Sequence, residues 1–182
     1  GRPAIAEGEI AAWNDMEPAF RLSGGKPSMD EPEMRSDKKN RGDELMALAQ
    51  VYRHNRIPRS SWRSDVAVFQ RRWEYWLDAE GFTDFTGLIE GALDEVEYAP
   101  GNPDVFIMDE AQDCSVLELE LVRKWNARAA YAVLAGDGDQ AIYGWRGGSA
   151  RAFLSPEIPD ENNYHLTQSY RVPRAVPVSY TH

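Results

Sequence analysis

The chain has 182 residues, a formal net charge of −10 and one cysteine, Cys114. This length allows one or two domains, and an apolar fraction of 42% with six tryptophans is typical of a folded protein rather than a disordered one. No apolar stretch is long enough to span a membrane, and the N-terminal residues do not resemble a secretory signal. Because a single cysteine cannot form an internal disulfide, we expect a reducing, cytoplasmic setting in which Cys114 serves packing rather than chemistry.

The negative net charge weakens an interpretation as a nucleic-acid-binding protein without excluding it, because local patches decide contacts. Between Tyr52 and Trp73 the balance is reversed, since six arginines face only Asp65. These are Arg53, Arg56, Arg59, Arg63, Arg71 and Arg72. The surplus is typical of a phosphate-contacting surface and equally of a solvated helix face and loop, and the sequence leaves both open.

The N-terminal region combines a weak helical pattern with a polar loop. Residues 7–20 carry the helical pattern, and residues 23–42, rich in Gly, Pro, Ser, Lys and Asp, are expected to form a flexible loop. Gly25-Lys26 does not form a phosphate loop, because Phe20 stands where a glycine is needed and Pro27 where Ser or Thr is needed.

Three helices are predicted next. The first is capped by Asp43 and ends at Pro58, and the second runs from about Asp65 to Gly81. The third begins at Asp84 and has the clearest helical spacing of apolar residues in the chain. Its apolar positions are Phe85, Leu88, Ile89, Ala92, Leu93 and Val96.

The second half of the chain has the pattern of an α/β protein. Residues 105–108 are all apolar, which is typical of a parallel strand buried on both faces. They end in Asp109 and Glu110, at the position where open α/β sheets bind ligands. A capping box beginning at Ser115 opens a helix. A second buried strand is predicted at 130–135, and a third, short strand at 164–167.

Three blocks in this half resemble motifs of the UvrD/Rep/PcrA group of superfamily 1 DNA helicases. Asp109-Glu110-Ala111-Gln112-Asp113 is similar to motif II, and residues 136–147, of the form Gly-Asp-x-x-Gln-x-Ile-Tyr-x-Trp-Arg-Gly, are similar to motif III. Ser169-Tyr170-Arg171 resembles motif IV, in which the family usually has Asn-Tyr-Arg. The order and spacing are those of the family, which is more specific than one short motif. Residues 84–89 resemble the segment by which these helicases return from an inserted helical subdomain to the motor core.

The resemblance implies that the complete protein uses ATP and Mg²⁺. Asp109 would hold the metal, and Glu110 would orient or deprotonate the attacking water. Gln140 would contact the γ-phosphate, Arg171 would neutralise charge on it, and Tyr170 would stack on adenine.

The resemblance also implies a link from the nucleotide to single-stranded DNA. Gln112 and Asp113 match positions that connect the nucleotide site to the motif III loop. Tyr143, Trp145 and Arg146 match residues that meet single-stranded DNA, and stacking on flat rings is strong yet tolerant of base sequence.

The expected fold is α/β, with a partial RecA-like parallel sheet of the P-loop NTPase type that lacks the phosphate-loop strand, and a mostly helical N-terminal subdomain. Residues 1–82 would form the helical insertion subdomain, residues 83–172 the partial motor domain, and residues 173–182 the start of a truncated following segment. Because the phosphate-loop lysine and the second motor domain are missing, this chain alone is predicted not to hydrolyse ATP. The bare edge of the strand at 130–135 is expected to favour self-association.

Two other functions remain open. The chain could be a DNA-binding or interaction module that has lost its nucleotide site. A magnesium-dependent nuclease is less favoured, because it gives no role to the spacing from Gln140 to Arg146. It would use the carboxylates of Asp109, Glu110, Asp113, Asp137 and Asp139.

Overall fold

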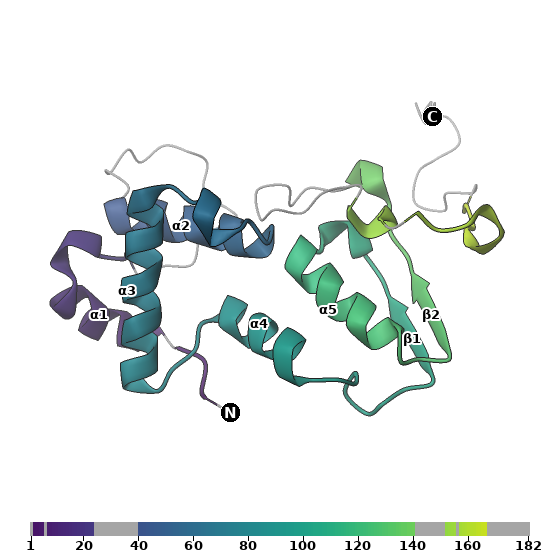
Figure 1. Ribbon diagram of the computed structural model, residues 1–182, viewed down its shortest axis with the longest axis horizontal. Coiled ribbons are helices and arrows are strands. Elements are labelled where there is room, and N and C mark those ends of the chain that lie inside the picture. The colour runs from purple at the N-terminus through teal and green to yellow at the C-terminus, as the bar shows by residue number, and fades with distance from the viewer. Residues whose placement is uncertain (1, 6, 24–39, 141–151, 156, 167–182) are drawn as a thin grey trace, which may run out of the picture.

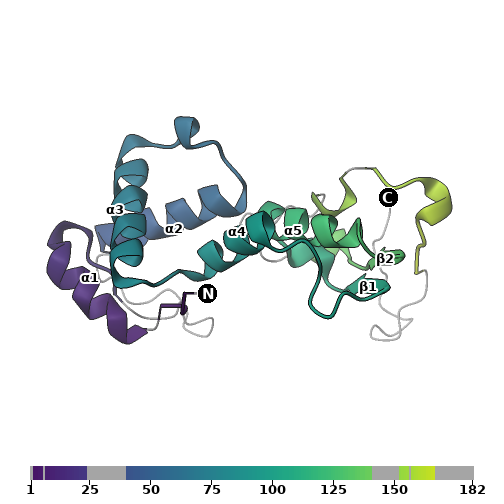
Figure 2. The same cartoon turned by 60° about the horizontal axis from the view of Figure 1, so that its bottom comes forward.

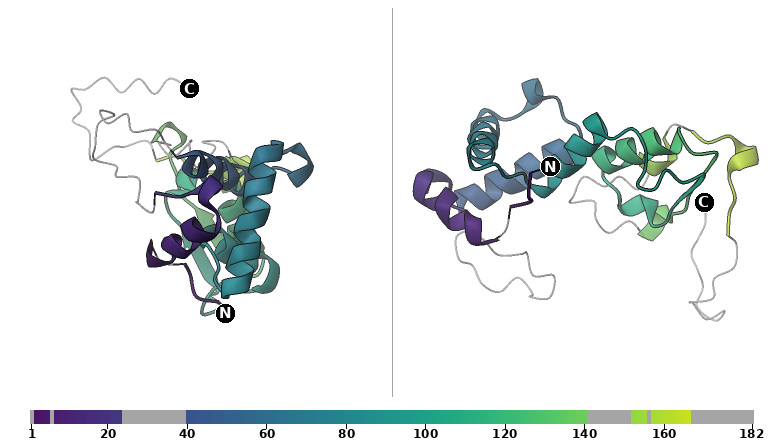
Figure 3. Two further views of the ribbon diagram at one scale, coloured as in Figure 1. Left: turned by 90° about the vertical axis from the view of Figure 1, so that its left-hand side faces the viewer. Right: turned by 90° about the horizontal axis from the view of Figure 1, so that it is seen from below.

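The computed structural model describes residues 2–5, 7–23, 40–140, 152–155 and 157–166. In this part of the chain the elements form two lobes, and α4 (Phe85–Glu95) lies between them, as Figure 1 shows. In Figure 2 the molecule is turned, and α4 again lies between the helical lobe and the lobe that holds the strands; the right-hand view of Figure 3 shows the same arrangement from below. The fold is therefore a mixed α/β arrangement with its helices and strands largely segregated.

The N-terminal lobe is helical and has an aromatic core. It contains α1 (Ile10–Met16), α2 (Arg41–His54) and α3 (Ser64–Glu80), with short 3-10 turns η1 (Glu7–Glu9), η2 (Pro18–Phe20) and η3 (Arg59–Ser61). The buried Trp13 ring lies edge-on to Phe69, Trp73 and Trp76, with centroid distances of 5.9, 5.1 and 5.7 Å. Such edge-to-face contacts add to the gain from burying the rings. The aromatic residues of α3 therefore form a core rather than a base-stacking surface.

Local sequence signals define most helix ends in this lobe, but α2 ends at His54, before Pro58, where its end was predicted. Gly81 ends α3 with φ +74°, as predicted. The helix expected to begin at Asp84 begins at Phe85, and Asp84 caps it by accepting a 2.6 Å hydrogen bond from the Gly87 N–H. The prediction that Asp43 caps α2 is wrong, because the helix begins at Arg41 and Asp43 lies in its first turn. Its carboxylate instead accepts a 2.9 Å hydrogen bond from the Ser23 N–H. Of the predicted loop, residues 24–39 lie outside the described residues.

The second lobe contains a β-α-β unit. Strand β1 (Val105–Met108) leads through η4 (Ala111–Asp113) and α5 (Val116–Asn126) to β2 (Tyr131–Leu134), which pairs with β1 in parallel, Val105 opposite Tyr131. The predicted capping box is present, with Ser115 N–H donating to Glu118 Oε2 at 2.7 Å. The remaining described elements are η5 (Gly138–Gln140), η7 (Ala152–Leu154) and η8 (Asp160–Asn162).

The sheet is covered on one face only, which corrects the predicted burial of both strands. Phe106 faces α5, where its ring lies 6.5 Å from that of Trp125, and Met108 and Leu134 pack on the small core of this lobe. On the other face Ile107 is 68% exposed and Tyr131 71% exposed. The reason is that α5 packs on one side, while no described element packs on the other. The third strand predicted at 164–167 is also wrong for residues 164–166, which form no strand.

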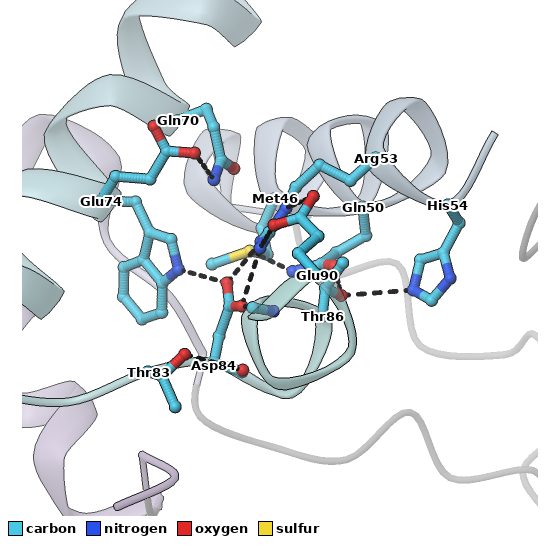
Figure 4. Close-up of polar contacts among 12 residues, drawn as sticks. Met46, Gln50, Arg53, His54, Gln70, Glu74, Thr83, Asp84, Thr86 and Glu90 are labelled. Carbon is cyan, nitrogen blue, oxygen red and sulfur yellow. Dashed lines mark hydrogen bonds and ion pairs between the residues drawn. The ribbon is translucent and has the colours of Figure 1, made fainter. Parts of the chain in front are cut away.

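A buried charge network ties α4 to the helical lobe (Figure 4). Arg53, only 5% exposed, binds Asp84 at 2.6 Å and Glu90 at 2.7 Å, and Asp84 also accepts a 2.9 Å hydrogen bond from Trp73 Nε1. Burial by itself lowers the pKa of Arg53, but its hydrogen bonds with Glu90 and Asp84 raise that pKa above its ordinary value. The network therefore holds a permanent cation inside the lobe.

The arginine-rich stretch is largely neutralised within the chain. Besides the buried Arg53, four of its arginines form ion pairs with carboxylates of other elements or of their own loop. The pairs are Arg56–Glu120 at 2.9 Å, Arg59–Glu74, Arg63–Asp65 at 2.7 Å and Arg72–Glu17 at 2.7 Å. The structure thus favours the solvated-face interpretation over a phosphate-contacting surface.

Two further contacts connect α4 with α5. Lys124 Nζ donates to the Leu93 carbonyl at 2.7 Å, and Trp125 Nε1 donates to the Val96 carbonyl at 3.3 Å. Both bonds satisfy carbonyls at the end of α4 that have no partner within the helix. Within the described ranges no helix has both the length and the apolarity needed to cross a membrane.

Candidate functional site

The acidic turn after β1 is held in a defined conformation. Glu110 has φ +53°, in the left-handed region that few residues other than glycine adopt, and its N–H donates to Asp109 Oδ1 at 2.9 Å. The next N–H, that of Ala111, donates to the Ala135 carbonyl at 2.9 Å and so continues the pairing with β2. Both Asp109 and Glu110 are exposed at the carboxyl end of the strand. This is the edge of the sheet at which the sequence places the site.

Gln112 connects the two strand ends. Its side chain is buried, its Nε2 donates to Glu110 Oε2 at 2.7 Å, and its Oε1 accepts from the Asp137 N–H at 2.9 Å. A buried amide is costly unless its donor and acceptor are both bonded, and here one bond stays within the acidic turn while the other reaches the chain after β2. Gln112 therefore fixes the position of the Glu110 carboxylate relative to the chain after β2.

Gln140 lies at the end of the same series of hydrogen bonds. Its Nε2 donates to Asp137 Oδ2 at 2.6 Å, and its backbone N–H donates to the Asp137 carbonyl at 3.0 Å. Glu110, Gln112, Asp137 and Gln140 are thus linked in order along one edge of the sheet. The structure thus links Glu110 to Gln140, thirty positions away in the chain, indirectly through Gln112 and Asp137.

Gly136 allows the close approach of these segments. A Cβ at this position would lie 2.7 Å from Gln112 Oε1 and 3.3 Å from Phe153 Cε2. The first distance is shorter than real contacts allow, so a larger residue would displace the Gln112 amide. Close packing against Gln112 and Phe153 therefore explains why a glycine stands at the start of the motif III block.

The donor atoms at this edge fit a magnesium ion that also binds phosphate. Mg²⁺ takes hard oxygen ligands, generally one or two carboxylates together with phosphate oxygens and waters. Asp109 and Glu110 supply exposed carboxylates, and the buried Asp113 Oδ1 has no hydrogen-bond partner among the described residues. Within the described ranges, no three His, Cys, Asp or Glu side chains gather as a metal-binding group.

Cys114, next to the acidic turn, is not set up as a nucleophile. Burial, followed by the nearby Glu118 and Asp113 carboxylates, raises the pKa of its thiol to about 11. Since the thiolate is the reactive form, this agrees with a packing role.

Several of the predicted site residues lie outside the described residues. They are Tyr143, Trp145, Arg146, Tyr170 and Arg171. Their roles remain predictions from the motifs.

A cavity of about 460 Å³ lies away from the acidic turn, in the helical lobe beside Arg53 and Asp84.

No sequence motif marks two residues that hold the segment at 152–154 in place. Phe153 is buried against Ala111 and Leu119, and Arg123 Nη2 donates to the Ala152 carbonyl at 2.6 Å. The apolar triplet at 152–154 was a weak signal for Phe153, and no local pattern pointed to Arg123.

The larger part of this chain is similar in sequence to known proteins. A family model described as UvrD/REP helicase N-terminal domain matches residues 33–158. A probable DNA helicase of Mycoplasma pneumoniae is 27% identical over 132 residues, covering 66% of this chain and 24% of the relative. ATP-dependent DNA helicase PcrA is 32% identical over 120 residues in Staphylococcus aureus and 30% identical over 115 in Staphylococcus epidermidis. These matches cover 61% and 58% of this chain and 16% of each PcrA, so the chain spans between 16% and 24% of these relatives.

Proposed function

The chain belongs to the UvrD/REP helicase N-terminal domain family, and on that premise we propose that it supplies the metal-binding and water-activating edge of an ATP-dependent DNA helicase. The family supports a role related to DNA helicases. The observation that carries the finer proposal is the hydrogen-bonded series from Glu110 through Gln112 and Asp137 to Gln140. It joins a carboxylate suited to water activation with an amide suited to phosphate contact.

In the proposed mechanism each residue at the edge has a separate task. Asp109 would hold Mg²⁺, which supplies charge neutralisation at the phosphates of ATP. Glu110 would orient or deprotonate the attacking water through Oε1, because Gln112 already occupies Oε2. Asp113 would complete the connection from this turn toward the motif III segment.

Gln140 would report the state of the γ-phosphate. Its Nε2 now donates to Asp137 Oδ2, and exchanging that partner for a phosphate oxygen would remove this hydrogen bond from Asp137. Since the Asp137 N–H is bonded to Gln112, such a change would reach the residue that positions Glu110. Arg171 and Tyr170 are proposed to bind the γ-phosphate and the adenine.

The nucleic-acid partner in this proposal is single-stranded DNA. Tyr143 and Trp145 would stack on bases, with Arg146 beside them contacting phosphate or a ring face. These residues follow Gln140 directly in the motif III block, so a shift at the phosphate would reach the base contacts through a short segment.

The domain organisation belongs to the same proposal. Residues 1–82 would be the helical insertion subdomain, 83–172 part of a RecA-like motor domain of the P-loop NTPase type, and 173–182 the start of a following segment. Two separate buried clusters, one in each lobe with α4 between them, support the division. The phosphate-loop motif is not present in these 182 residues, so this chain by itself should release no phosphate from Mg-ATP.

DNA binding tests the proposal. We expect the chain to bind a fluorescent oligo-dT of about 20 nucleotides at low salt, and Trp145→Ala to weaken binding roughly five- to a hundredfold, the loss of one stacked base. Tyr75→Ala is the matched control, because Tyr75 is an exposed aromatic residue on α3 in the other lobe. Equal affinity of wild type and Trp145→Ala would contradict the assignment. Cleavage of the oligonucleotide with Mg²⁺ and no nucleotide would instead favour a nuclease.

A further inference from the structure

Helix α4 is rich in apolar residues but buries few of them. Five of its eleven residues are apolar, namely Phe85, Leu88, Ile89, Ala92 and Leu93. The structure describes this helix in full, and its single buried side chain is that of Thr86. Phe85 is 72% exposed and Leu88 41% exposed. Because apolar surface in contact with water is unfavourable, the exposed side of α4 is a candidate binding surface.

The other side of α4 is already occupied. Figure 4 shows Thr86 and Glu90 directed toward α2, where the Thr86 hydroxyl donates to Gln50 and Glu90 binds Arg53 at 2.7 Å. The helix also packs against α5. The side that faces α2 and α5 is therefore not available to a partner.

The exposed side forms a continuous row along the helix. Residues three, four or seven positions apart share one face of a helix. Phe85, Leu88 and Ala92 have this spacing, and so do Leu88, Gly91 and Glu95. All five are exposed or half-buried, and together they are called the α4 strip.

Gly91 leaves an open position in the α4 strip. A Cβ at Gly91 would meet no surrounding atom within 4 Å, whereas a Cβ at Gly87 would lie 2.6 Å from Thr83 Oγ1. Glycine inside a helix is less favourable than alanine by about 0.5–1 kcal/mol, and the described contacts give Gly91 no packing reason. A glycine between Leu88 and Glu95 lets the backbone of a second helix approach closely.

Two carboxylates near the end of the strip have no partner among the described residues. Asp94 and Glu95 are exposed, and neither carboxylate forms an ion pair or hydrogen bond there. Lys124 and Arg128 of the neighbouring segment bind Glu97 instead, at 3.2 and 2.9 Å. Negative charge in the last turn of a helix is unfavourable, because the helix dipole is negative at that end. A cationic partner would relieve this charge, while nucleic-acid or lipid phosphates, or the same strip of a second copy, would be repelled.

We propose that the α4 strip is the docking site for a cationic amphipathic helix of a partner protein. Apolar side chains of that helix pack on Phe85 and Leu88, and its backbone approaches Gly91. Its Lys or Arg side chains pair with Asp94 and Glu95. None of these residues belongs to the acidic turn or to the motif III block, so the inference goes beyond the proposed function.

A designed peptide serves as the probe. It has about 18 residues, with Leu at helical spacing, Lys elsewhere and a fluorescein label, and fluorescence anisotropy measures its binding to the chain. We expect the peptide to bind at low salt and to bind more weakly as salt is added. The same peptide with Glu in place of every Lys should not bind. Equal binding of the two peptides, or binding of neither, would overturn the proposal.

Gly91→Gln tests whether the peptide lies on α4. The change should raise the thermal unfolding midpoint, because glutamine favours the helix and its side chain meets open space. It should lower the peptide affinity roughly tenfold, the loss of one central contact. Gly8→Gln is the matched control, because a Cβ at Gly8, in η1, also meets nothing within 4 Å, and its affinity should equal that of wild type. Unchanged affinity in Gly91→Gln would overturn the proposal, since the peptide would then bind elsewhere.

A double variant tests the charge contacts. Asp94→Asn with Glu95→Gln should weaken peptide binding roughly two- to tenfold at low salt, the loss of two exposed ion pairs. The matched control is Asp160→Asn with Glu161→Gln, which neutralises two adjacent exposed acids of η8 and should change nothing. An equal loss in both double variants would contradict docking at α4, because net charge alone would then attract the peptide. If sedimentation velocity shows that Gly91→Gln abolishes a dimer of the chain, the strip binds a second copy and the proposal is wrong.

Discussion

At the scale of single residues, the position of Gln112 determines how the acidic edge is organised. Its amide satisfies a carboxylate on one side and a backbone N–H on the other, and it is almost completely buried. Removing such a group takes a hydrogen bond from both partners, of which the exposed Glu110 carboxylate can still bind water. Gly136 belongs to the same arrangement, because it leaves room for that amide.

Gln112→Leu should lower the free energy of unfolding by about 1–3 kcal/mol, because the Asp137 N–H and Glu110 Oε2 both lose their partner. Urea denaturation followed by circular dichroism measures the change. Gln140→Leu is the control, since it removes the same amide from an exposed position of the same series, and it should cost less than about 1 kcal/mol. An equal loss of unfolding free energy in the two variants would show that the two hydrogen bonds of the Gln112 amide add nothing to stability.

At the scale of elements, α4 depends on a charge network for its first turn. Asp84 caps the helix and also binds Arg53 of α2 and Trp73 of α3. Burial by itself raises the pKa of Asp84, but the Arg53 hydrogen bond and charge, followed by the Trp73 hydrogen bond, outweigh it and hold that pKa below its ordinary value. The start of α4 is therefore joined to the helical lobe, while its end is bonded by Lys124 and Trp125 of α5.

The lowered pKa of Asp84 predicts an acid-sensitive contribution to stability. The contribution is fully present above the ordinary carboxyl pKa of about 4 and is lost as pH falls through the lower folded-state value. Asp84→Asn should lower the free energy of unfolding by roughly 3 kcal/mol at neutral pH, because Arg53 stays buried with one anion fewer.

Measuring the free energy of unfolding over a series of pH values tests this contribution, with a second variant as the control. In Asp84→Asn the decline of stability below about pH 4 should be shallower than in wild type. Asp94→Asn, an exposed change on the same helix, should retain the wild-type decline. Parallel pH curves for Asp84→Asn and wild type would show that the network makes no such contribution.

At the scale of the whole molecule, one face of the two-stranded sheet stays uncovered. Val105, Ile107, Tyr131 and Val133 share that face, because partners in a parallel register point the same way. Parallel sheets are normally covered on both faces, and an exposed apolar strand edge can pair with another chain. Among the described residues β2 pairs only with β1, so the other edge of β2 can pair with a second copy of this chain.

Self-association through this region is the predicted consequence. Sedimentation velocity should show a dimer that increases with protein concentration, and Val133→Lys should reduce it by placing a charge beside the open side of β2. Val68→Lys, a matched change at an exposed valine of α3 in the other lobe, should leave the dimer unchanged. A wild-type chain that stays monomeric at all concentrations would contradict the prediction.

The sequence by itself determined the family and most helix ends. Gly81, Asp84 and the Ser115–Glu118 box act within a few residues of their own position, so local pattern is sufficient to find them. The motif blocks likewise led to the family that the comparison then confirmed.

Only the tertiary structure decided which distant groups meet. Arg53 in the arginine-rich stretch binds carboxylates 31 and 37 residues away, and Gln112 bonds to a backbone group 25 residues away. The apolar strands are uncovered on one face because no described element packs there, although their composition predicted full burial. Pairing and burial depend on neighbours brought together through space, and hydrophobic spacing along the chain does not specify those neighbours.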